Sequence, residues 1–158
     1  MAHKILVSFL GEGDLLPKIV NAVLKSNIIP PENIFLCDKD TAVKQTVSNK
    51  DVVFCPDDMD IVVKGEIIVA LARKKGELAS VLSPISGCTR GRIIVAICPD
   101  ITCDYVLERV LGGTTVMAVK PLMRDNQKPT ATLEFSDMFP PYMRTPCVDI
   151  VSSIFEII

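Results

Sequence analysis

The sequence predicts an α/β fold, with a mostly parallel, doubly wound sheet of six to seven strands and helices on both faces. Short runs of β-branched and other apolar residues recur along the 158 residues, and segments with helical spacing of apolar residues lie between them. Most of these runs are almost continuously apolar, which is typical of strands buried on both faces. Strands that alternate with helices imply right-handed crossovers and a parallel sheet.

The strand candidates are short and rich in valine and isoleucine. Five of them are nearly continuous apolar runs, at residues 4–10, 34–37, 52–54, 66–71 and 92–97. A sixth strand is expected at 114–119, and a seventh candidate lies at 130–135.

The helix candidates fill the intervals between the strands. After the first strand, five apolar residues fall on one helical face: Leu16, Ile19, Val20, Val23 and Leu24. Asp14 is a suitable N-cap there, and Pro17 lies in the first turn, where a missing N–H costs little. Further helices are predicted at 41–48, 57–64, 76–85, 102–112 and 147–158. Thr102 should cap the fifth of these six helices, and the Pro-rich segment 136–146 is predicted as a surface loop.

Composition and charge exclude several classes of protein. Apolar residues make up 49% of the chain, enough for a substantial core in one domain spanning residues 1–158. The net charge of −2 argues against a nucleic-acid partner. No apolar run approaches the roughly 20 residues that cross a bilayer, and no cleavage site follows the first apolar run. We therefore expect neither a membrane partner nor a signal peptide.

The cysteines do not show the spacing of a metal site. Six are present, at positions 37, 55, 88, 98, 103 and 147, and no pair forms C-x-x-C. The only histidine is His3, so four closely spaced zinc ligands are not available. The pattern favours reduced thiols that act as small apolar side chains in a cytoplasmic protein.

Two short charged runs allow alternative interpretations. The acids of "DDMD" at 57–60 could hold a divalent ion, but acids that open a helix also match its dipole. We favour the helix interpretation and predict no metal site. The basic run "RKK" at 73–75 is either an ordinary solvated loop or an anion contact.

A glycine-containing turn after the first strand is the strongest functional signal. In G-x-G-x-x-G, the first glycine permits the tight turn, the second lets the backbone approach a pyrophosphate, and the third lets the helix pack closely. Gly11 and Gly13 occupy the first two positions, and Leu16 occupies the third, so the helix should stand further from the sheet or tilt. Glu12 and Asp14 add negative charge where a pyrophosphate would lie.

The end of the second strand carries a complementary signal. Asp38 follows Gly13 by 25 residues, and an acid at that place commonly binds the ribose hydroxyls of NAD. Lys39 is next to it, and a basic residue suits the extra phosphate of NADP. Asp38 and Lys39 together do not decide between NAD and NADP as the cofactor. The alternative interpretation is a simple polar turn without a cofactor role.

Several segments resemble a known family, the pyrroline-5-carboxylate reductases. They are the opening "KILVSFLGEGDLLPKIVNAVL", the "PPENI" before the second strand, "EIIVALARKK", and "IIVAICPDITCDYVLERVLGG". The resemblance covers about positions 4–120 and implies a Rossmann-type domain that binds NADPH or NADH. It also implies a second, all-helical domain that forms a dimer and supplies most of the substrate pocket.

The resemblance assigns three groups of residues to the dinucleotide. The groups are Gly11, Gly13, Asp14 and Leu15 along the pyrophosphate, Asp38 and Lys39 near the adenosine ribose, and Ala70, Leu71 and Ala72 at the nicotinamide-side edge. No catalytic residue is assigned.

The sequence departs from the family pattern where the nicotinamide and substrate would lie. Arg73-Lys74 replaces the family's Lys-Pro, the turn 98–100 replaces a small-residue turn, and 119–123 corresponds only loosely to a Met-Pro-Asn-Thr-Pro stretch. The sequence stops at Ile158, about where the helical domain would begin, so we expect that domain to be absent.

Three functional hypotheses follow from these observations. The first is a dinucleotide-binding module that is weak or inactive as an oxidoreductase alone. The second is a reductase completed by self-association or by a separate helical subunit. The third is a scaffold that has lost the cofactor and serves in interaction or regulation. The last helix either forms a homodimer or packs back on the sheet.

Overall fold

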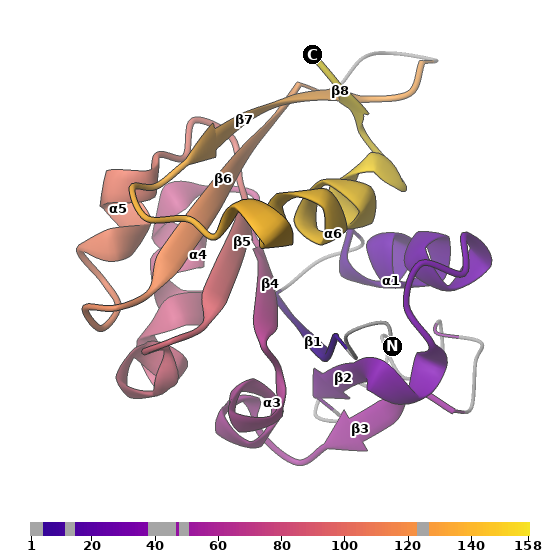
Figure 1. Ribbon diagram of the computed structural model, residues 1–158, viewed down its shortest axis with the longest axis horizontal. Helices are drawn as coiled ribbons and strands as arrows, with labels where there is room; N and C mark the ends of the chain where they lie inside the picture. Colours follow the sequence, from indigo (N-terminus) through magenta and orange to yellow (C-terminus); the bar gives the residue numbers. More distant parts are fainter. Residues whose placement is uncertain (1–4, 12–14, 38–46, 48–50, 123–126) are drawn as a thin grey trace.

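In the residues that the structure describes, the fold is an eight-stranded sheet with helices on both faces (Figure 1). A computed structural model describes residues 5–11, 15–37, 47, 51–122 and 127–158. The strands lie in the order β3-β2-β1-β4-β5-β6-β7-β8. The predicted α/β class and mostly parallel sheet are confirmed, and the strand number is one or two higher than expected.

Six parallel strands form the larger part of the sheet. They are β1 (Val7–Gly11), β2 (Ile34–Cys37), β3 (Val53–Cys55), β4 (Ile67–Leu71), β5 (Ile93–Ile97) and β6 (Thr115–Leu122). The strand β7 (Thr130–Phe135) runs antiparallel to β6, and β8 (Glu156–Ile157) runs parallel to β7.

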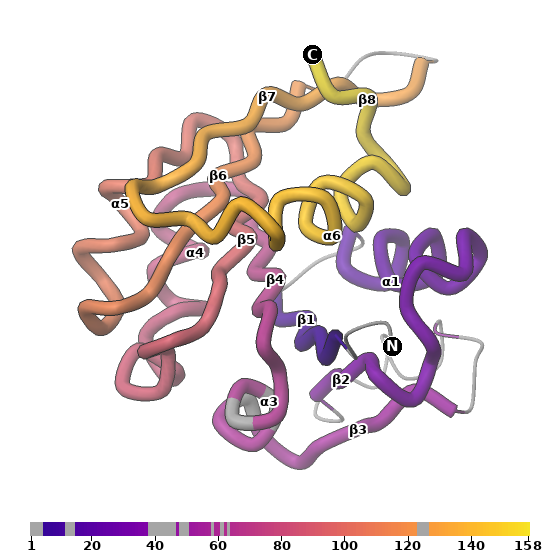
Figure 2. Tube along the Cα trace, viewed as in Figure 1, coloured from indigo at the N-terminus to yellow at the C-terminus, as the bar shows by residue number. Residues whose placement is uncertain are grey.

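The helices divide between the two faces of the sheet. α1 (Leu15–Lys25) and α6 (Pro141–Ser152) lie side by side over one face (Figures 1 and 2). The other face carries α3 (Asp58–Lys64), α4 (Lys75–Leu82), the 3-10 helix η2 (Ser83–Cys88) and α5 (Cys103–Leu107). A short 3-10 helix, η1 (Pro31–Asn33), precedes β2. Apart from Val47, the helix predicted at 41–48 lies outside the described residues.

The continuous apolar runs are explained by burial on both faces. In β4, Ile67, Val69 and Leu71 face the cluster beneath α1 and α6, whereas Ile68 and Ala70 face the cluster beneath α3, α4 and α5. All five side chains are fully buried. Each strand residue therefore contributes to one of two cores, as the period of two requires.

Two predicted helices have different bounds in the structure. α5 ends at Leu107 rather than at 112, although Thr102 caps it as expected: its Oγ1 accepts a hydrogen bond from the Tyr105 N–H at 3.2 Å. The helix predicted at 76–85 is confirmed as far as Leu82, and the chain continues as η2 through Pro84. Proline is tolerated there because it lies in the first turn of the new helical segment.

The prediction for the C-terminal segment was wrong in its bounds. α6 begins at Pro141, inside the segment predicted as a loop, and ends at Ser152, after which the chain forms β8. Proline suits the first turn of a helix, whereas Pro146 lies inside α6, where it cannot donate a main-chain hydrogen bond. The helix is stabilised by burial of one face, which consists of Met143, Cys147, Ile150 and Val151.

The same burial concerns the two arrangements considered for the last helix, of which the homodimer stays a prediction. These four side chains belong to the cluster that also contains residues of α1 and the sheet. α6 therefore packs back on its own domain. Among the apolar residues that lead into α6, Met138 and Tyr142 are exposed, whereas Phe139 and Met143 are buried.

Candidate functional site

The candidate site is the edge of the sheet where the parallel strands end. In open α/β sheets, ligands bind outside the carboxyl ends of the strands, at the point where the strand order reverses. Here that point lies between β1 and β4, because β1 pairs with β2 on one side and with β4 on the other. Gly11, the last residue of β1, is in register with Leu71, the last residue of β4.

Gly11 is required by the sheet itself. Its φ is +144°, a conformation that side chains rarely adopt. A Cβ atom at this position would overlap the carbonyl oxygen of Leu71. The glycine is therefore explained by close contact between β1 and β4, whether or not a nucleotide binds beside it.

The residues assigned to the glycine turn are only partly described. Leu15 begins α1 and is half-buried, and Leu16 is buried in the cluster that contains Phe9 of β1. Gly13 and Asp14 lie outside the described residues. The expected tilt of the helix at Leu16 stays a prediction.

The other assigned residues fall at two strand ends. Asp38 and Lys39, which directly follow β2, lie outside the described residues. Ala70 and Leu71 are fully buried, with their side chains on opposite faces of the sheet, and Ala72 is nearly buried. A ligand at this edge would therefore contact mainly the main chain of β4 and the turn that follows it.

The turn after β4 is held by hydrogen bonds from three directions. The Ala72 N–H donates to the carbonyl oxygen of Ile97 at 3.1 Å. The Arg73 N–H donates to Glu77 Oε2 at 3.2 Å. The Tyr105 hydroxyl of α5 donates to the Lys75 carbonyl oxygen at 2.9 Å.

The basic run 73–75 belongs partly to a helix. Lys74 is the N-cap residue of α4, and Lys75 is its first residue. All three basic residues are exposed. Within the described ranges, no carboxylate lies at ion-pair distance from Arg73 or Lys74. Arg73 and Lys74 thus lie in the expected loop and Lys75 begins α4, so the run presents positive charge near the carboxyl edge.

The turn after β5 is equally ordered. The Cys98 N–H donates to the Val119 carbonyl oxygen at 3.1 Å, and the Cys98 carbonyl oxygen accepts from the Ile101 N–H at 3.3 Å. Asp100 is exposed and has a φ of +59°. Burial raises the pKa of the Cys98 thiol, with Lys75 opposing this effect. The thiol is therefore a poor nucleophile at this edge.

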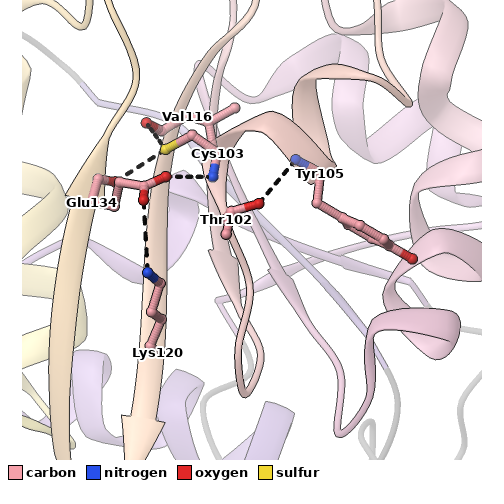
Figure 3. Close-up of polar contacts among 6 residues, drawn as sticks. All are labelled: Thr102, Cys103, Tyr105, Val116, Lys120 and Glu134. Carbon is pink, nitrogen blue, oxygen red and sulfur yellow. Dashed lines mark hydrogen bonds and ion pairs between the residues drawn. The ribbon is translucent and has the colours of Figure 1, made fainter.

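A contact from β7 fixes the start of α5 (Figure 3). Glu134 Oε1 accepts a hydrogen bond from the Cys103 N–H at 2.7 Å, and Glu134 Oε2 lies 3.7 Å from Lys120 Nζ. The Cys103 thiol donates to the carbonyl oxygens of Glu134 at 3.3 Å and Val116 at 3.6 Å. Glu134 could not be predicted from the sequence, because no local pattern links residues that lie 31 positions apart.

The ionisation of this pair follows from its hydrogen bonds. The Cys103 N–H, the Cys103 thiol and Lys120 lower the pKa of Glu134. Burial, followed by the Glu134 carboxylate, raises the pKa of Cys103 to about 12. The carboxylate is thus an acceptor that anchors the turn, and the thiol is a protonated donor.

A cavity of about 560 Å³ lies at the opposite edge of the sheet. It is lined by residues that precede or begin β4, β5 and β6 and by the start of α6: Glu66, Gly91, Ile93, Gly113, Thr115, Pro140, Tyr142 and Met143. Of the residues predicted for the dinucleotide, those that the structure describes, namely Gly11, Leu15, Ala70, Leu71 and Ala72, do not line it.

The described part of the chain also bears on metal binding and membranes. Within it, no three His, Cys, Asp or Glu side chains gather closely enough to hold a metal ion. Within the same ranges, no helix combines the length and apolar character needed to traverse a bilayer.

Comparison with known proteins finds similarity to reductases. No family model matches the sequence. The chain is 26% identical to the pyrroline-5-carboxylate reductase of Methanosarcina acetivorans over 116 residues, which are 73% of this chain and 43% of that protein.

Solved structures share the fold. Plasmodium falciparum pyrroline carboxylate reductase with NADP bound matches with a TM-score of 0.77 and 19% identity over 98% of this chain and 56% of that one. The Coxiella burnetii pyrroline-5-carboxylate reductase gives a TM-score of 0.82 at 12% identity, over 99% and 58%. A Streptomyces aurantiacus imine reductase gives 0.69 at 13% identity, over 96% and 53%.

The sheet order and helix layers define a Rossmann-like α/β domain. In sequence and fold, this domain resembles the pyrroline-5-carboxylate reductases, which confirms the resemblance predicted from its sequence motifs. The chain spans about half of the length of the relatives it matches.

Proposed function

We propose that this chain is a dinucleotide-binding module of the reductase type, a single domain over residues 1–158 that binds NADPH or NADH. We further propose that it is weak or inactive as an oxidoreductase on its own. The observation that carries the proposal is the register of Gly11 with Leu71, which puts a glycine-ended β1 at the reversal point of the strand order. The fold likeness to a reductase with NADP bound supports it.

The proposed site uses the three groups of residues named from the sequence. Gly11, Gly13, Asp14 and Leu15 would follow the pyrophosphate, and Asp38 and Lys39 the adenosine ribose. Ala70, Leu71 and Ala72 would border the nicotinamide. The described residues fit such a ligand, because Gly11 carries no side chain at the strand end and the adjacent turn carries exposed positive charge.

Weak activity follows from what hydride transfer needs. The nicotinamide must be held against its substrate in a shaped pocket that excludes water. The resemblance assigns the second wall of that pocket to a helical domain beyond this one. The described thiols at this edge, Cys98 and Cys103, have raised pKa values and do not provide a substitute nucleophile.

Titration with NADPH and NADH, followed by nicotinamide fluorescence, tests the proposal. We expect saturable binding to the wild-type protein and its loss when Gly13 is replaced by valine. Gly76→Val, at an exposed helical position with open space around it, is the matched control and should leave affinity unchanged. Binding weaker than about 1 mM for both dinucleotides would contradict the proposal.

A scaffold without cofactor is the second candidate function. Glu12 and Asp14 favour it because their charge opposes a pyrophosphate, and Leu16 favours it because it replaces the third glycine. This candidate predicts no dinucleotide binding, so the same titration separates it from the first.

The third candidate function is a reductase completed by self-association or by a separate helical subunit. Exposed Met138 and Tyr142, beside the start of α6, offer apolar surface for such contact. Only this candidate predicts turnover of a pyrroline carboxylate or a related cyclic imine by the pure protein with NADPH. Absence of turnover with intact binding would exclude completion by self-association and leave the first candidate or completion by a separate subunit.

A further inference from the structure

Two cysteines face each other at the end of neighbouring strands. Cys37 is the last residue of β2, and Cys55 is the last residue of β3. They are paired in register in the parallel ladder. Both side chains lie on the sheet face covered by α3, in the same apolar cluster.

The distance between these positions suits a disulfide. Neighbouring strands lie about 4.8 Å apart, and disulfides join Cα atoms separated by about 4.4 to 6.8 Å. The Cys37 sulfur is 4.0 Å from the carbonyl oxygen of Pro56, the residue that follows Cys55. The Cys37 thiol therefore already lies against the end of β3.

The mobility needed to close the bond is available at the sheet edge. β3 has three residues and is the terminal strand of the described sheet, where it pairs with β2. Because the spacing of the two strands already suits a disulfide, closing the bond needs rotation of the two side chains and only a small adjustment of β3. A central strand, paired on both sides, could not shift without disturbing its other neighbour.

Exposure gives the two thiols different roles. Cys37 is partly exposed, whereas Cys55 is only 3% exposed. An oxidant in solution would therefore react first with Cys37. Cys98, Cys103 and Cys147 are all buried, and none of them is paired across strands with a second cysteine.

We propose that Cys37 and Cys55 form a reversible disulfide with a low-molecular-weight disulfide, such as oxidised glutathione, as the oxidant. The Cys37 thiolate attacks one sulfur of the oxidant and releases one thiol, which leaves a mixed disulfide. The Cys55 thiolate then attacks the Cys37 sulfur and releases the second thiol. The two cysteines lose two electrons and two protons, and the oxidant becomes two thiols. This proposal is independent of dinucleotide binding.

Peptide mapping of the full chain tests the proposal. The protein is incubated with oxidised glutathione, alkylated, digested with trypsin and analysed by mass spectrometry without reduction. Lysines separate the two cysteines into the peptides 26–39 and 51–64. We expect these two peptides to appear as one linked species that lacks two hydrogens and that dithiothreitol separates.

Single variants locate the bond. Cys37→Ser and Cys55→Ser should each abolish the linked species, and Cys37→Ser should also remove the glutathione adduct. Cys88→Ser, at another partly exposed cysteine outside the pair, should leave the amount of the linked species unchanged. Thermal melting confirms that each variant is folded. Wild-type protein in which both peptides are alkylated, or in which Cys37 keeps glutathione without linkage to Cys55, would overturn the proposal.

Discussion

Glu134 accepts a 2.7 Å hydrogen bond from the main-chain N–H of Cys103, and this contact joins the antiparallel strand β7 to the start of α5. The same carboxylate faces Lys120 of β6 at 3.7 Å. One side chain thus connects three elements beside the turn that ends β5. Because that turn borders the proposed nicotinamide edge, we expect Glu134 to act on the site by holding the start of α5 in place.

Removal of Glu134 should destabilise the domain. A hydrogen bond to a charged group contributes roughly 1.5–3 kcal/mol to the free energy of unfolding. Partial exposure of the carboxylate reduces this contribution, so we expect Glu134→Ala to lower the free energy of unfolding by about 1–2 kcal/mol. Lys120→Ala removes only a surface ion pair and should cost at most about 0.5 kcal/mol. Urea denaturation measures both. Equal costs would show that the ion pair, and not the Cys103 N–H, is the important partner.

The contribution of Glu134 should depend on pH. Its pKa is lowered from 4.5 in the folded protein by the Cys103 N–H, the Cys103 thiol and Lys120. A lowered folded pKa means that the carboxylate stabilises the fold above pH 4.5 and that this contribution is lost as the pH falls below it. The difference in stability between wild type and Glu134→Gln, measured from pH 7 to pH 3, should therefore shrink at the acid end. A constant difference would contradict this assignment.

Gly11 should tolerate no side chain. Gly11→Ala would place a Cβ atom against the Leu71 carbonyl oxygen and force a φ of +144° on a residue that avoids it. We expect a loss of about 2–4 kcal/mol or failure to fold. Gly76→Ala, inside α4 with open space around it, should stabilise the protein by about 0.5–1 kcal/mol. Thermal unfolding compares the two, and a stable Gly11→Ala protein would show that β1 and β4 are less closely joined.

The sheet could be predicted because its central strands carry their signal in every residue. In β4, all five side chains enter one core or the other, so the sequence is continuously apolar. α6 was placed incorrectly because Pro140, Pro141 and Pro146 resemble a loop, whereas burial of Met143 and Cys147 stabilises a helix. Tertiary packing overcame local propensity at this point.

The candidate site was less predictable than the fold. Gly11 was recognised from its place after a strand, but its contact with Leu71 depends on the strand order, which no local pattern shows. The Glu134–Cys103 hydrogen bond depends on the antiparallel addition of β7 beside β6. Such contacts require knowledge of which strands are neighbours.

The packing of α6 on its own sheet predicts a contrast between two methionines. Met143 is 4% exposed and lies in the core shared with α1, whereas Met138 is 89% exposed. Met143→Ala should therefore cost about 2–4 kcal/mol, and Met138→Ala should change stability by less than about 0.5 kcal/mol. Chemical denaturation measures both. Similar small effects would mean that α6 does not contribute to this core in solution.

Lys39 offers the sharpest test of which dinucleotide the domain prefers. The side chain follows β2 in the sequence, where a positive charge suits the additional phosphate of NADP and Asp38 suits a free ribose hydroxyl. Lys39→Glu reverses that charge, so we expect the Kd for NADPH to rise about tenfold or more, while the Kd for NADH changes little. Lys64→Glu is the matched control, since it makes the same change of net charge at an exposed position at the end of α3. Because α3 ends where β4 begins, Lys64 lies at the opposite edge of the sheet from the proposed site, and its substitution should affect neither dinucleotide. Equal losses for NADPH and NADH in Lys39→Glu would remove Lys39 from the phosphate-binding role and would leave Asp38 and the ribose as the basis for recognition.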